Sequence, residues 1–229
     1  MNSINKKTYV YKMNLLPANI LCILMFIGCV ILAVLLKVNV VEFNNWFLLF
    51  LFIILYLMLH EFLHGVGYFI GGTKRKNIAY GIELEKGIFY AMAYQKLTKK
   101  NILISLQMPF TVIGVITFII GVIFNIPVLV ALSIINLSGA AMDLAMFIFF
   151  LRLPKDFTYS ESGNPDEFVI ISSEDLSKKK SIFLKLIEVK KYKDKDFEFK
   201  DIKKFKITRV SIVLIVLFLL LGIVSTILG

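Results

Sequence analysis

Cysteine and histidine are scarce in this chain, which has only two of each among its 229 residues. Both cysteines, Cys22 and Cys29, fall in the first long apolar run, and this position argues against a structural disulfide. Their C-x6-C spacing is not a metal-binding motif by itself. The two histidines, His60 and His64, are four residues apart, so imidazole chemistry is confined to one place in the sequence.

Charged residues are rare inside the long apolar runs and gather between them. The chain is 58% hydrophobic, and its mean hydropathy of +0.81 is far above that of a soluble domain of this length. Its 26 basic residues exceed its 16 acidic residues, which gives a net charge of +10. In a soluble protein this charge would suggest a nucleic-acid partner. Here the basic segments separate apolar runs, so we expect a membrane protein that binds no nucleic acid.

Five apolar runs are each long enough to cross about 30 Å of hydrocarbon as a helix. We therefore expect an all-α polytopic membrane protein with about five transmembrane helices. A membrane domain would cover residues 1–151, a basic cytosolic region residues 152–207, and a last transmembrane helix residues 208–229. The expected spans of the membrane domain are about 18–38, 46–70, 102–124 and 127–151.

The basic segment after the second span contains two short stretches in which side chains alternate with period two. They run over residues 78–84 and 88–94 and are separated by the turn sequence Glu85-Lys86-Gly87. This pattern predicts a small β-hairpin. The hairpin would hold an unwound substrate at its free edge, or it would only plug the mouth of the site, and the sequence does not separate these roles.

The distribution of basic residues predicts the orientation of the chain. Residues 1–17, 71–101 and 152–207 hold 3, 7 and 14 of the 26 positive charges, whereas the connections at 39–45 and 125–126 hold none. Because basic loops stay in the cytoplasm, five spans place the N-terminus in the cytoplasm and the C-terminus outside. We expect a multi-pass protein of the cell membrane, embedded in the lipid bilayer, with its active site near the cytoplasmic side.

The two histidines belong to the sequence His60-Glu61-Phe62-Leu63-His64 near the end of the second span. On a helix, residues four apart lie on one face, so both imidazoles can reach one ion. The H-E-x-x-H spacing does this for zinc and leaves the glutamate beside the open coordination position. A structural or sensory metal site is the alternative, although ionisable groups inside a membrane span are costly and usually functional.

A third candidate ligand, Asp143, lies in the fourth span at a matching depth. His64 and Asp143 are about six and about eight residues from the cytoplasmic ends of their spans, which agrees to within a helical turn. Zinc held by two histidines would give this carboxylate the partner that an isolated aspartate in lipid lacks. Two histidines and one carboxylate leave the fourth position for water, as a catalytic zinc site requires.

Asn136, Gly139, Ala140 and Asp143 form one stripe on the fourth span, at positions i, i+3, i+4 and i+7. Small residues there let two helices approach closely enough to share an ion. Asn136 lies on the face of Asp143 and would donate a hydrogen bond to a substrate carbonyl, or would only bond a neighbouring helix. For Asp143 the alternative is a structural polar contact.

These two segments resemble those of a known class of enzymes. His60-Glu61-x-x-His64 and Asn136-Leu-Ser-Gly-Ala-Ala-Met-Asp143 are similar to the motifs of site-2-protease-like intramembrane zinc metallopeptidases. With Leu151-Arg-Leu-Pro-Lys155 after the aspartate, the pattern more specifically resembles the small bacterial membrane proteins named putative zincin peptidases. Larger members of the class carry Leu-Asp-Gly where this chain has Met142-Asp143-Leu144, and proline where it has Gly139.

The resemblance implies hydrolysis of peptide bonds in membrane protein or peptide substrates, within or near the membrane. We expect one zinc ion, held by His60, His64 and Asp143, to activate a water molecule. Glu61 would act as the general base and then deliver the proton to the leaving amine. Zinc and Asn136 would stabilise the oxyanion, so Glu61 and Asn136 are the candidate catalytic residues.

Two other functions use similar residues. A secondary transporter or ion pathway also places histidine and aspartate in the membrane, but five spans without an inverted repeat fit it poorly. A non-catalytic metal-binding scaffold or assembly factor is the second alternative, and the complete set of ligands and base argues against it. The sequence does not name the substrate, the pathway or the oligomeric state.

Overall fold

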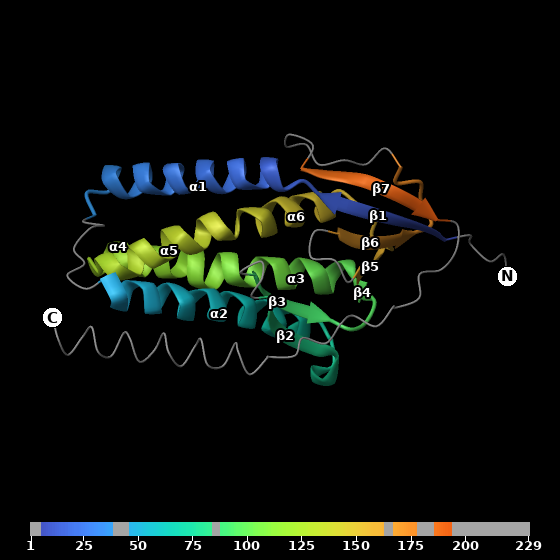
Figure 1. Ribbon diagram of the computed structural model, residues 1–229, viewed down its shortest axis with the longest axis horizontal. Helices are drawn as coiled ribbons and strands as arrows, with labels where there is room; N and C mark the ends of the chain where they lie inside the picture. Colours follow the sequence, from blue (N-terminus) through green and yellow to red (C-terminus); the bar gives the residue numbers. More distant parts are fainter. Residues whose placement is uncertain (1–5, 39–45, 84–87, 163–166, 178–185, 194–229) are drawn as a thin grey trace.

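The computed structural model describes residues 6–38, 46–83, 88–162, 167–177 and 186–193. A bundle of helices lies along the longest axis, and a five-stranded antiparallel sheet stands at one end of it (Figure 1). The helices are α1 (Leu15–Leu35), α2 (Trp46–Ile70), η1 (Arg75–Asn77), α3 (Lys99–Pro109), the π-helix η2 (Phe110–Ile116), α4 (Thr117–Ile123), α5 (Pro127–Gly139) and α6 (Ala141–Leu151). The strands are β1 (Lys7–Met13), β2 (Ile78–Glu83), β3 (Ile88–Ala93), β4 (Leu97–Thr98), β5 (Thr158–Glu161), β6 (Glu167–Ser172) and β7 (Ile187–Lys193).

Three helical segments among the described residues are long and apolar enough to cross a membrane: Leu15–Leu35, Phe50–Ile70 and Lys99–Ile123. The last of these is formed by α3, η2 and α4 in succession. A fourth crossing is counted if α5 and α6, which meet at an angle of 47°, form one bent span. These lengths are consistent with membrane association. The helix that we predict for residues 208–229 lies outside the described residues.

The prediction of an all-α protein is wrong. The sheet has the strand order β4-β5-β6-β1-β7, so it combines the segment before the first helix with strands from the region predicted to be a solvated tail. β1 lies between β6 and β7, and Tyr9 pairs with Ile170 on one side and Tyr192 on the other. These strands are short and their partners come from distant parts of the chain. Local alternation of side chains therefore gives little sign of them.

An aromatic cluster joins the sheet to the helical bundle. Phe168 of β6 is 1% exposed, and its ring centroid lies 5.4 Å from that of Tyr11 in β1 and 5.4 Å from that of Phe150 in α6. Tyr159 of β5 and Phe149 of α6 pack against the same ring. Aromatic pairs at these separations add to the free energy gained by burying apolar surface. The cluster fixes the end of α6 on the sheet and thereby constrains the rest of that helix.

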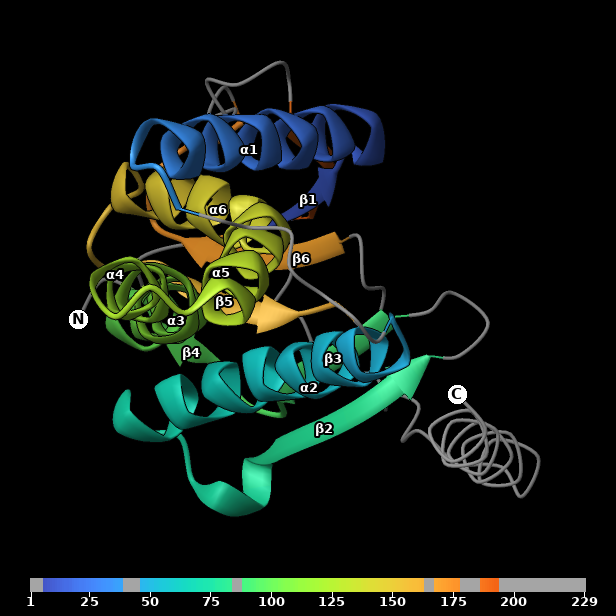
Figure 2. The same cartoon turned by 90° about the vertical axis from the view of Figure 1, so that its left-hand side faces the viewer.

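The predicted hairpin is present. β2 and β3 form a separate two-stranded antiparallel sheet in which Ile78 pairs with Ala93. Figure 2 shows this sheet lying against α2. Tyr80 of β2 makes the closest contact, because its ring stacks on Phe62 and its hydroxyl donates to the Phe62 carbonyl. Gly65 makes room for this contact, since a Cβ at that position would collide with the Tyr80 hydroxyl.

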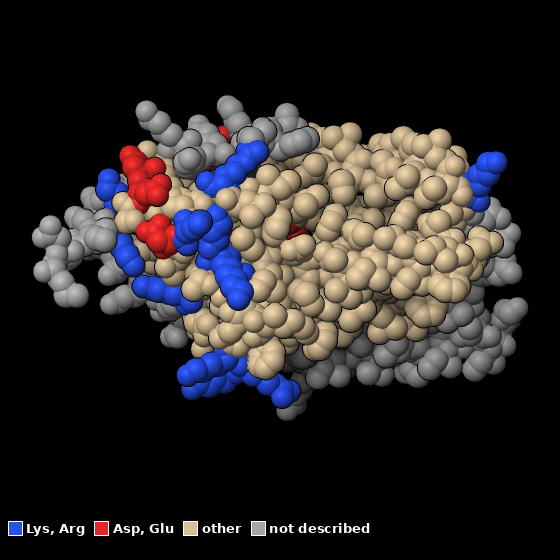
Figure 3. Space-filling model, turned by 180° about the vertical axis from the view of Figure 1, so that it is seen from behind, with Lys and Arg blue, Asp and Glu red and all other residues tan. Residues whose placement is uncertain are grey.

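Charged side chains are distributed unevenly between the two parts. Figure 3 shows the basic and acidic residues gathered at the end that carries the sheet, while the surface over the helices is almost free of charge. Large apolar side chains point outward there, and Leu24 and Leu35 of α1 are 52% and 72% exposed. This surface suits hydrocarbon better than water, because exposed apolar area on such a scale is unfavourable in water.

Candidate metal centre

Helix α2 presents both histidines on the face that packs against α3, α5 and α6. The four-residue spacing places the two rings one above the other, with the Nε2 atoms 3.1 Å apart. Each residue is 8% exposed. The only two imidazoles of the chain therefore converge on one buried point.

Helix α6 brings Asp143 to the same point. Its Oδ2 atom lies 3.1 Å from Nε2 of His60 and 3.4 Å from Nε2 of His64. Asp143 sits in the first turn of α6, immediately after the 47° bend that separates this helix from α5. The bend creates a helix N-terminus among apolar residues, and the positive end of the helix dipole stabilises the carboxylate there.

The spacing of the three atoms fits a zinc ion. The two Nε2 atoms and Oδ2 form a triangle with sides of 3.1, 3.1 and 3.4 Å. Ligand atoms of a tetrahedral zinc site with bonds of about 2.0–2.1 Å are about 3.3 Å apart. Two imidazoles and one carboxylate are also a donor set that zinc accepts. The residues present are therefore suited to hold the ion without large rearrangement.

Hydrogen bonds to the other ring nitrogens hold the imidazoles in the orientation that metal binding needs. Nδ1 of His60 is 2.8 Å from Oδ1 of Asn136, and Nδ1 of His64 is 3.0 Å from the carbonyl oxygen of Ser105. Both partners are acceptors, so each Nδ1 carries the proton and donates it. This tautomer leaves the Nε2 lone pairs free for an ion.

Asn136 stands behind His60, and both ends of its amide are engaged. Oδ1 accepts from His60, while Nδ2 donates to the carbonyl oxygen of Pro109 at 3.2 Å. The residue is 4% exposed and does not line the cavity beside the histidines. The predicted donation to a substrate carbonyl therefore does not match this geometry, whereas the alternative, a bond to a neighbouring helix, does.

The carbonyl oxygen of Pro109, which accepts from Asn136, belongs to an irregular part of the third span. Pro109 lacks a backbone N–H, and the chain continues from it as the π-helix η2. A π-helix shifts the backbone pairing by one residue and is often found where a side chain enters the ladder. Here Tyr56 of α2 donates to the carbonyl oxygen of Ile113 at 2.7 Å. The irregular segment is thereby hydrogen-bonded to both α2 and α5.

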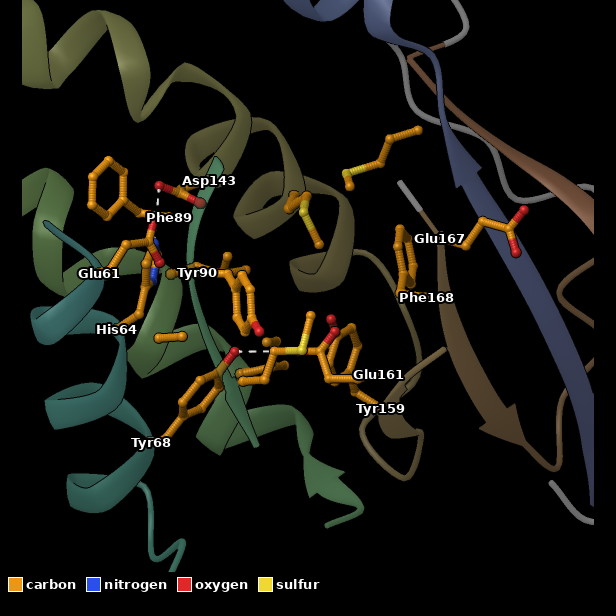
Figure 4. Close-up of a pocket in the computed structure, with 16 residues that line it drawn as sticks. Glu61, His64, Tyr68, Phe89, Tyr90, Asp143, Tyr159, Glu161, Glu167 and Phe168 are labelled. Atoms are coloured by element: carbon orange, nitrogen blue, oxygen red, sulfur yellow. Dashed lines mark hydrogen bonds and ion pairs between the residues drawn. The ribbon is translucent and has the colours of Figure 1, made fainter. Parts of the chain in front are cut away.

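Glu61 lies beside the ligand atoms. One of its carboxylate oxygens belongs, with a nitrogen of each histidine, to a group of atoms that all lie within 4.8 Å of one another. The carboxylate accepts a hydrogen bond from the backbone N–H of Ala91 in β3. Figure 4 shows Glu61, His64 and Asp143 on the same wall of a cavity. The hairpin therefore positions the glutamate next to the metal ligands.

The cavity has a volume of about 200 Å³ and extends from these residues toward the sheet. Tyr68 of α2 and two residues of β5, Tyr159 and Glu161, line its other end. The Tyr68 hydroxyl donates to Oε1 of Glu161 at 3.5 Å. Burial raises the pKa of the Glu161 carboxyl to about 7, although hydrogen bonds from Tyr159 and Tyr68 act in the opposite direction.

Sequence reasoning did not identify three of the residues around the cavity. Tyr68 follows His60 and His64 at the same four-residue spacing, so the helical face gave a usable signal for it. Ser105 contributes a backbone carbonyl, which no side-chain pattern reveals. Glu161 stands in the predicted basic cytosolic region 152–207, for which no strand was expected, and the pairing of β5 with β4 and β6 brings it to the site.

Residues 53–158 match the protein family described as "Putative zincin peptidase". The matched segment contains the H-E-x-x-H motif, Asn136 and Asp143, and it confirms the resemblance drawn from those residues. No curated protein and no solved structure matches the chain. This match and the group of His60, Glu61 and His64, which could hold a metal ion, are consistent with a zinc peptidase.

Proposed function

Taking as the premise that residues 53–158 are those of a zincin peptidase, we propose that this protein is a membrane-embedded zinc metallopeptidase. It hydrolyses peptide bonds of membrane protein or peptide substrates within or beside the bilayer. The observation that carries the proposal is the triangle formed by the Nε2 atoms of His60 and His64 and Oδ2 of Asp143. A shared cation would offset the cost of placing these ionisable side chains together in an apolar surrounding.

A zinc ion held by these three residues would supply a Lewis acid that lowers the pKa of a water molecule and polarises a substrate carbonyl. Glu61 is close enough to receive the proton of that water, since its carboxylate lies within 4.8 Å of the histidine nitrogens. The Ala91 N–H holds the carboxylate in place. After the peptide bond breaks, Glu61 returns the proton to the leaving amine.

Asn136 and Ser105 act through the histidines. They fix the Nδ1–H tautomer of each ring and orient both Nε2 atoms toward Asp143. Partners of this kind affect metal affinity and activity almost as strongly as the ligands themselves. In this proposal Asn136 is a positioning residue that acts through His60.

The hairpin gives a route for the substrate backbone. A transmembrane helix offers no free carbonyl, so it must unwind locally before hydrolysis. β3 carries the N–H that holds Glu61, and within the described residues its one strand partner is β2. An unwound segment pairing with the open edge of β3 would pass directly beside the general base. We propose this mode of binding, with the hairpin on the cytoplasmic side as the basic residues predict.

The test is a pair of substitutions that separate metal binding from proton transfer. Glu61→Gln removes the base but none of the three ligands, so zinc content should stay near one equivalent while cleavage falls by about 10²–10⁴-fold. Asp143→Ala removes a ligand, so both zinc and cleavage should be lost. Metal analysis of detergent-purified protein and a membrane-peptide cleavage assay measure these outcomes. Undiminished cleavage by Glu61→Gln, or purified protein that binds no zinc, would refute the proposal.

A further inference from the structure

The cavity beside the metal centre has two ends with different chemistry. Glu61, His64 and Asp143 line the end inside the helical bundle, whereas Tyr68, Tyr159 and Glu161 line the end next to the sheet (Figure 4). Four carboxylates line the cavity, but no lysine or arginine of the described chain does so. The proposed mechanism uses the carboxylates of Asp143 and Glu61. It gives no role to Glu161.

We propose that Glu161, held by Tyr68 and Tyr159, is a specificity residue that binds a positively charged nitrogen group of the peptide substrate. The group is an ammonium or guanidinium, supplied by a lysine or arginine side chain or by a free chain end. This inference rests on the proposed peptidase function and names the kind of substrate that the same site accepts. Glu161 lies outside the segment that matches the putative zincin peptidase family, which ends at residue 158.

The geometry around Glu161 favours a cationic ligand. Tyr159 is two residues before it on β5, so the two side chains share one face of the strand. The phenols of Tyr159 and Tyr68 occupy part of the acceptor capacity of the carboxylate, which has about four lone-pair sites. The remaining sites face the cavity and can accept from an ammonium or guanidinium group.

Apolar walls of the cavity suit the stem of a long basic side chain. Ile102 and Leu106 of α3 and Met146 of α6 are among the residues that line it. Lysine and arginine bury their methylene groups against such apolar surfaces while their charged ends reach a polar partner. A substrate with its backbone near Glu61 can therefore place a lysine or arginine along these walls toward Glu161.

The electrostatics of the unliganded site point the same way. Burial raises the pKa of Glu161 to about 7, so the folded protein keeps a carboxylate in a place that disfavours its charge. A cationic ligand would supply the missing opposite charge. Groups with pKa values shifted in this way are concentrated at functional sites.

The test compares peptides that differ only in the charged group. One peptide contains a single lysine, and its counterparts carry norleucine or acetyl-lysine at that position, each with a free or an acetylated N-terminus. Affinities are measured with the full chain in detergent, loaded with zinc, in the Glu61→Gln background so that no peptide is consumed. We expect the lysine peptide to bind about tenfold more tightly than the norleucine peptide, because hydrogen bonds to charged groups contribute on this scale. If the affinity instead falls when the N-terminus is acetylated, the free chain end is the source of the positive charge.

A second substitution, added to the Glu61→Gln protein, tests whether Glu161 causes the preference for the cationic peptide. Adding Glu161→Gln keeps the size of the side chain and one acceptor oxygen but removes the charge, and the preference for the cationic peptide should disappear. Adding Glu174→Gln removes the same charge from an exposed position near the sheet, and the preference should remain. If the Glu161→Gln protein does not fold, Glu161→Asp, which withdraws the charge by one methylene group, should bind the cationic peptide with a reduced preference.

Failure of this inference can be told apart from failure of the peptidase proposal. Equal affinities for all peptides, or a preference that survives Glu161→Gln, overturn the role of Glu161. Cleavage by the unaltered protein without any preference for a basic residue has the same meaning and leaves the peptidase intact. A preference that depends on Glu161, in a protein that cleaves none of the peptides, supports the subsite and overturns hydrolysis.

Discussion

The helical bundle and the sheet place their apolar side chains in opposite directions. In the sheet, Tyr9, Tyr11 and Phe168 are no more than 1% exposed and form the centre of the core. In α1, a 21-residue helix, the described buried residues are Ala18 and Ala33, and the large apolar side chains point outward. One part of the chain is therefore built for water and the other for hydrocarbon.

This contrast explains how each part is stabilised. Burial of large apolar side chains drives folding of the sheet. Between helices in lipid that driving force is absent, so close approach of small residues and buried polar contacts take its place. The candidate metal centre is an example of such buried polar contacts between helices, because it joins α2, α3, α5 and α6. Its cavity extends toward the sheet.

The largest expected effect comes from the core of the sheet. Phe168→Ala removes the ring that Tyr11, Tyr159, Phe149 and Phe150 surround, and it should lower the free energy of unfolding by about 3–5 kcal/mol. Denaturant unfolding followed by near-UV circular dichroism measures this loss. The lipid-facing control Leu24→Ala should change stability far less. Equal losses for both variants would mean that the two parts are not built differently.

A charge placed on the outward-facing surface of α1 tests whether this helix faces hydrocarbon. Leu24 is 52% exposed near the middle of the helix, so Leu24→Lys should reduce insertion of this helix by an apparent free energy of about 2.5–3.5 kcal/mol. A membrane-insertion assay with glycosylation sites measures it. Ser177→Lys, at an exposed position next to the sheet, should leave insertion unchanged. If Leu24→Lys is equally harmless, α1 does not face lipid.

A methyl group between two helices should have a smaller effect. A Cβ at Gly67 would lie 2.5 Å from the Cα of Ser105, so Gly67→Ala forces α2 and α3 apart and costs about 1–3 kcal/mol. Because Ser105 orients His64, zinc affinity should fall as well, and titration with a competing chelator measures this. Gly28→Ala in α1 is the matched control, since nothing lies within 4 Å of its added methyl group. Unchanged zinc affinity in Gly67→Ala would show that helix spacing does not control the site.

The smallest expected effect concerns the carboxyl group of Glu161, between the helical bundle and the sheet. This effect depends on pH. The folded-state pKa of Glu161 is raised from 4.5 to about 7, so folding favours the protonated form. Below about pH 4.5 the group is protonated in both the folded and unfolded states and carries no penalty; above about pH 7 the full penalty applies. Glu161→Gln should thus stabilise the protein by about 1–2 kcal/mol near pH 8, about half the full linkage value because the carboxyl is partly exposed.

Thermal unfolding of both proteins across this pH range measures the effect. Glu174→Gln is the control, because it removes the same charge from an exposed side chain. A Glu161→Gln variant that is no more stable at high pH than at low pH would contradict the assigned environment of the carboxyl.

The metal centre was more predictable than the fold because its geometry follows from helix periodicity and from depth in the membrane. Four residues between His60 and His64 fix one helical face, and counting residues from the span ends places Asp143 at the same level. In the structure Oδ2 of Asp143 lies 3.1 Å from Nε2 of His60 and 3.4 Å from Nε2 of His64. The 47° bend after Gly139 was not predicted, although Ser138-Gly139 is the kind of pair at which helices kink.

The sheet was not predictable for a physical reason. Strand pairing depends on partners, and the partners of β1 come from the far end of the described chain. β6, with the sequence Glu-Phe-Val-Ile-Ile-Ser, is buried on both faces and does not alternate. Glu161 was missed for the same reason, because a residue in an unrecognised strand cannot be assigned to a cavity.

The central position of β1 has a consequence for how the protein is made. β1 is synthesised before all the spans that follow it, yet both of its neighbours, β6 and β7, emerge only after α6. During synthesis this strand must wait with two open edges, a state that is prone to aberrant pairing. A chain that ends prematurely after α6 would contain all three metal ligands but would display an unpaired strand, a feature by which cellular quality control could tell it from the finished protein.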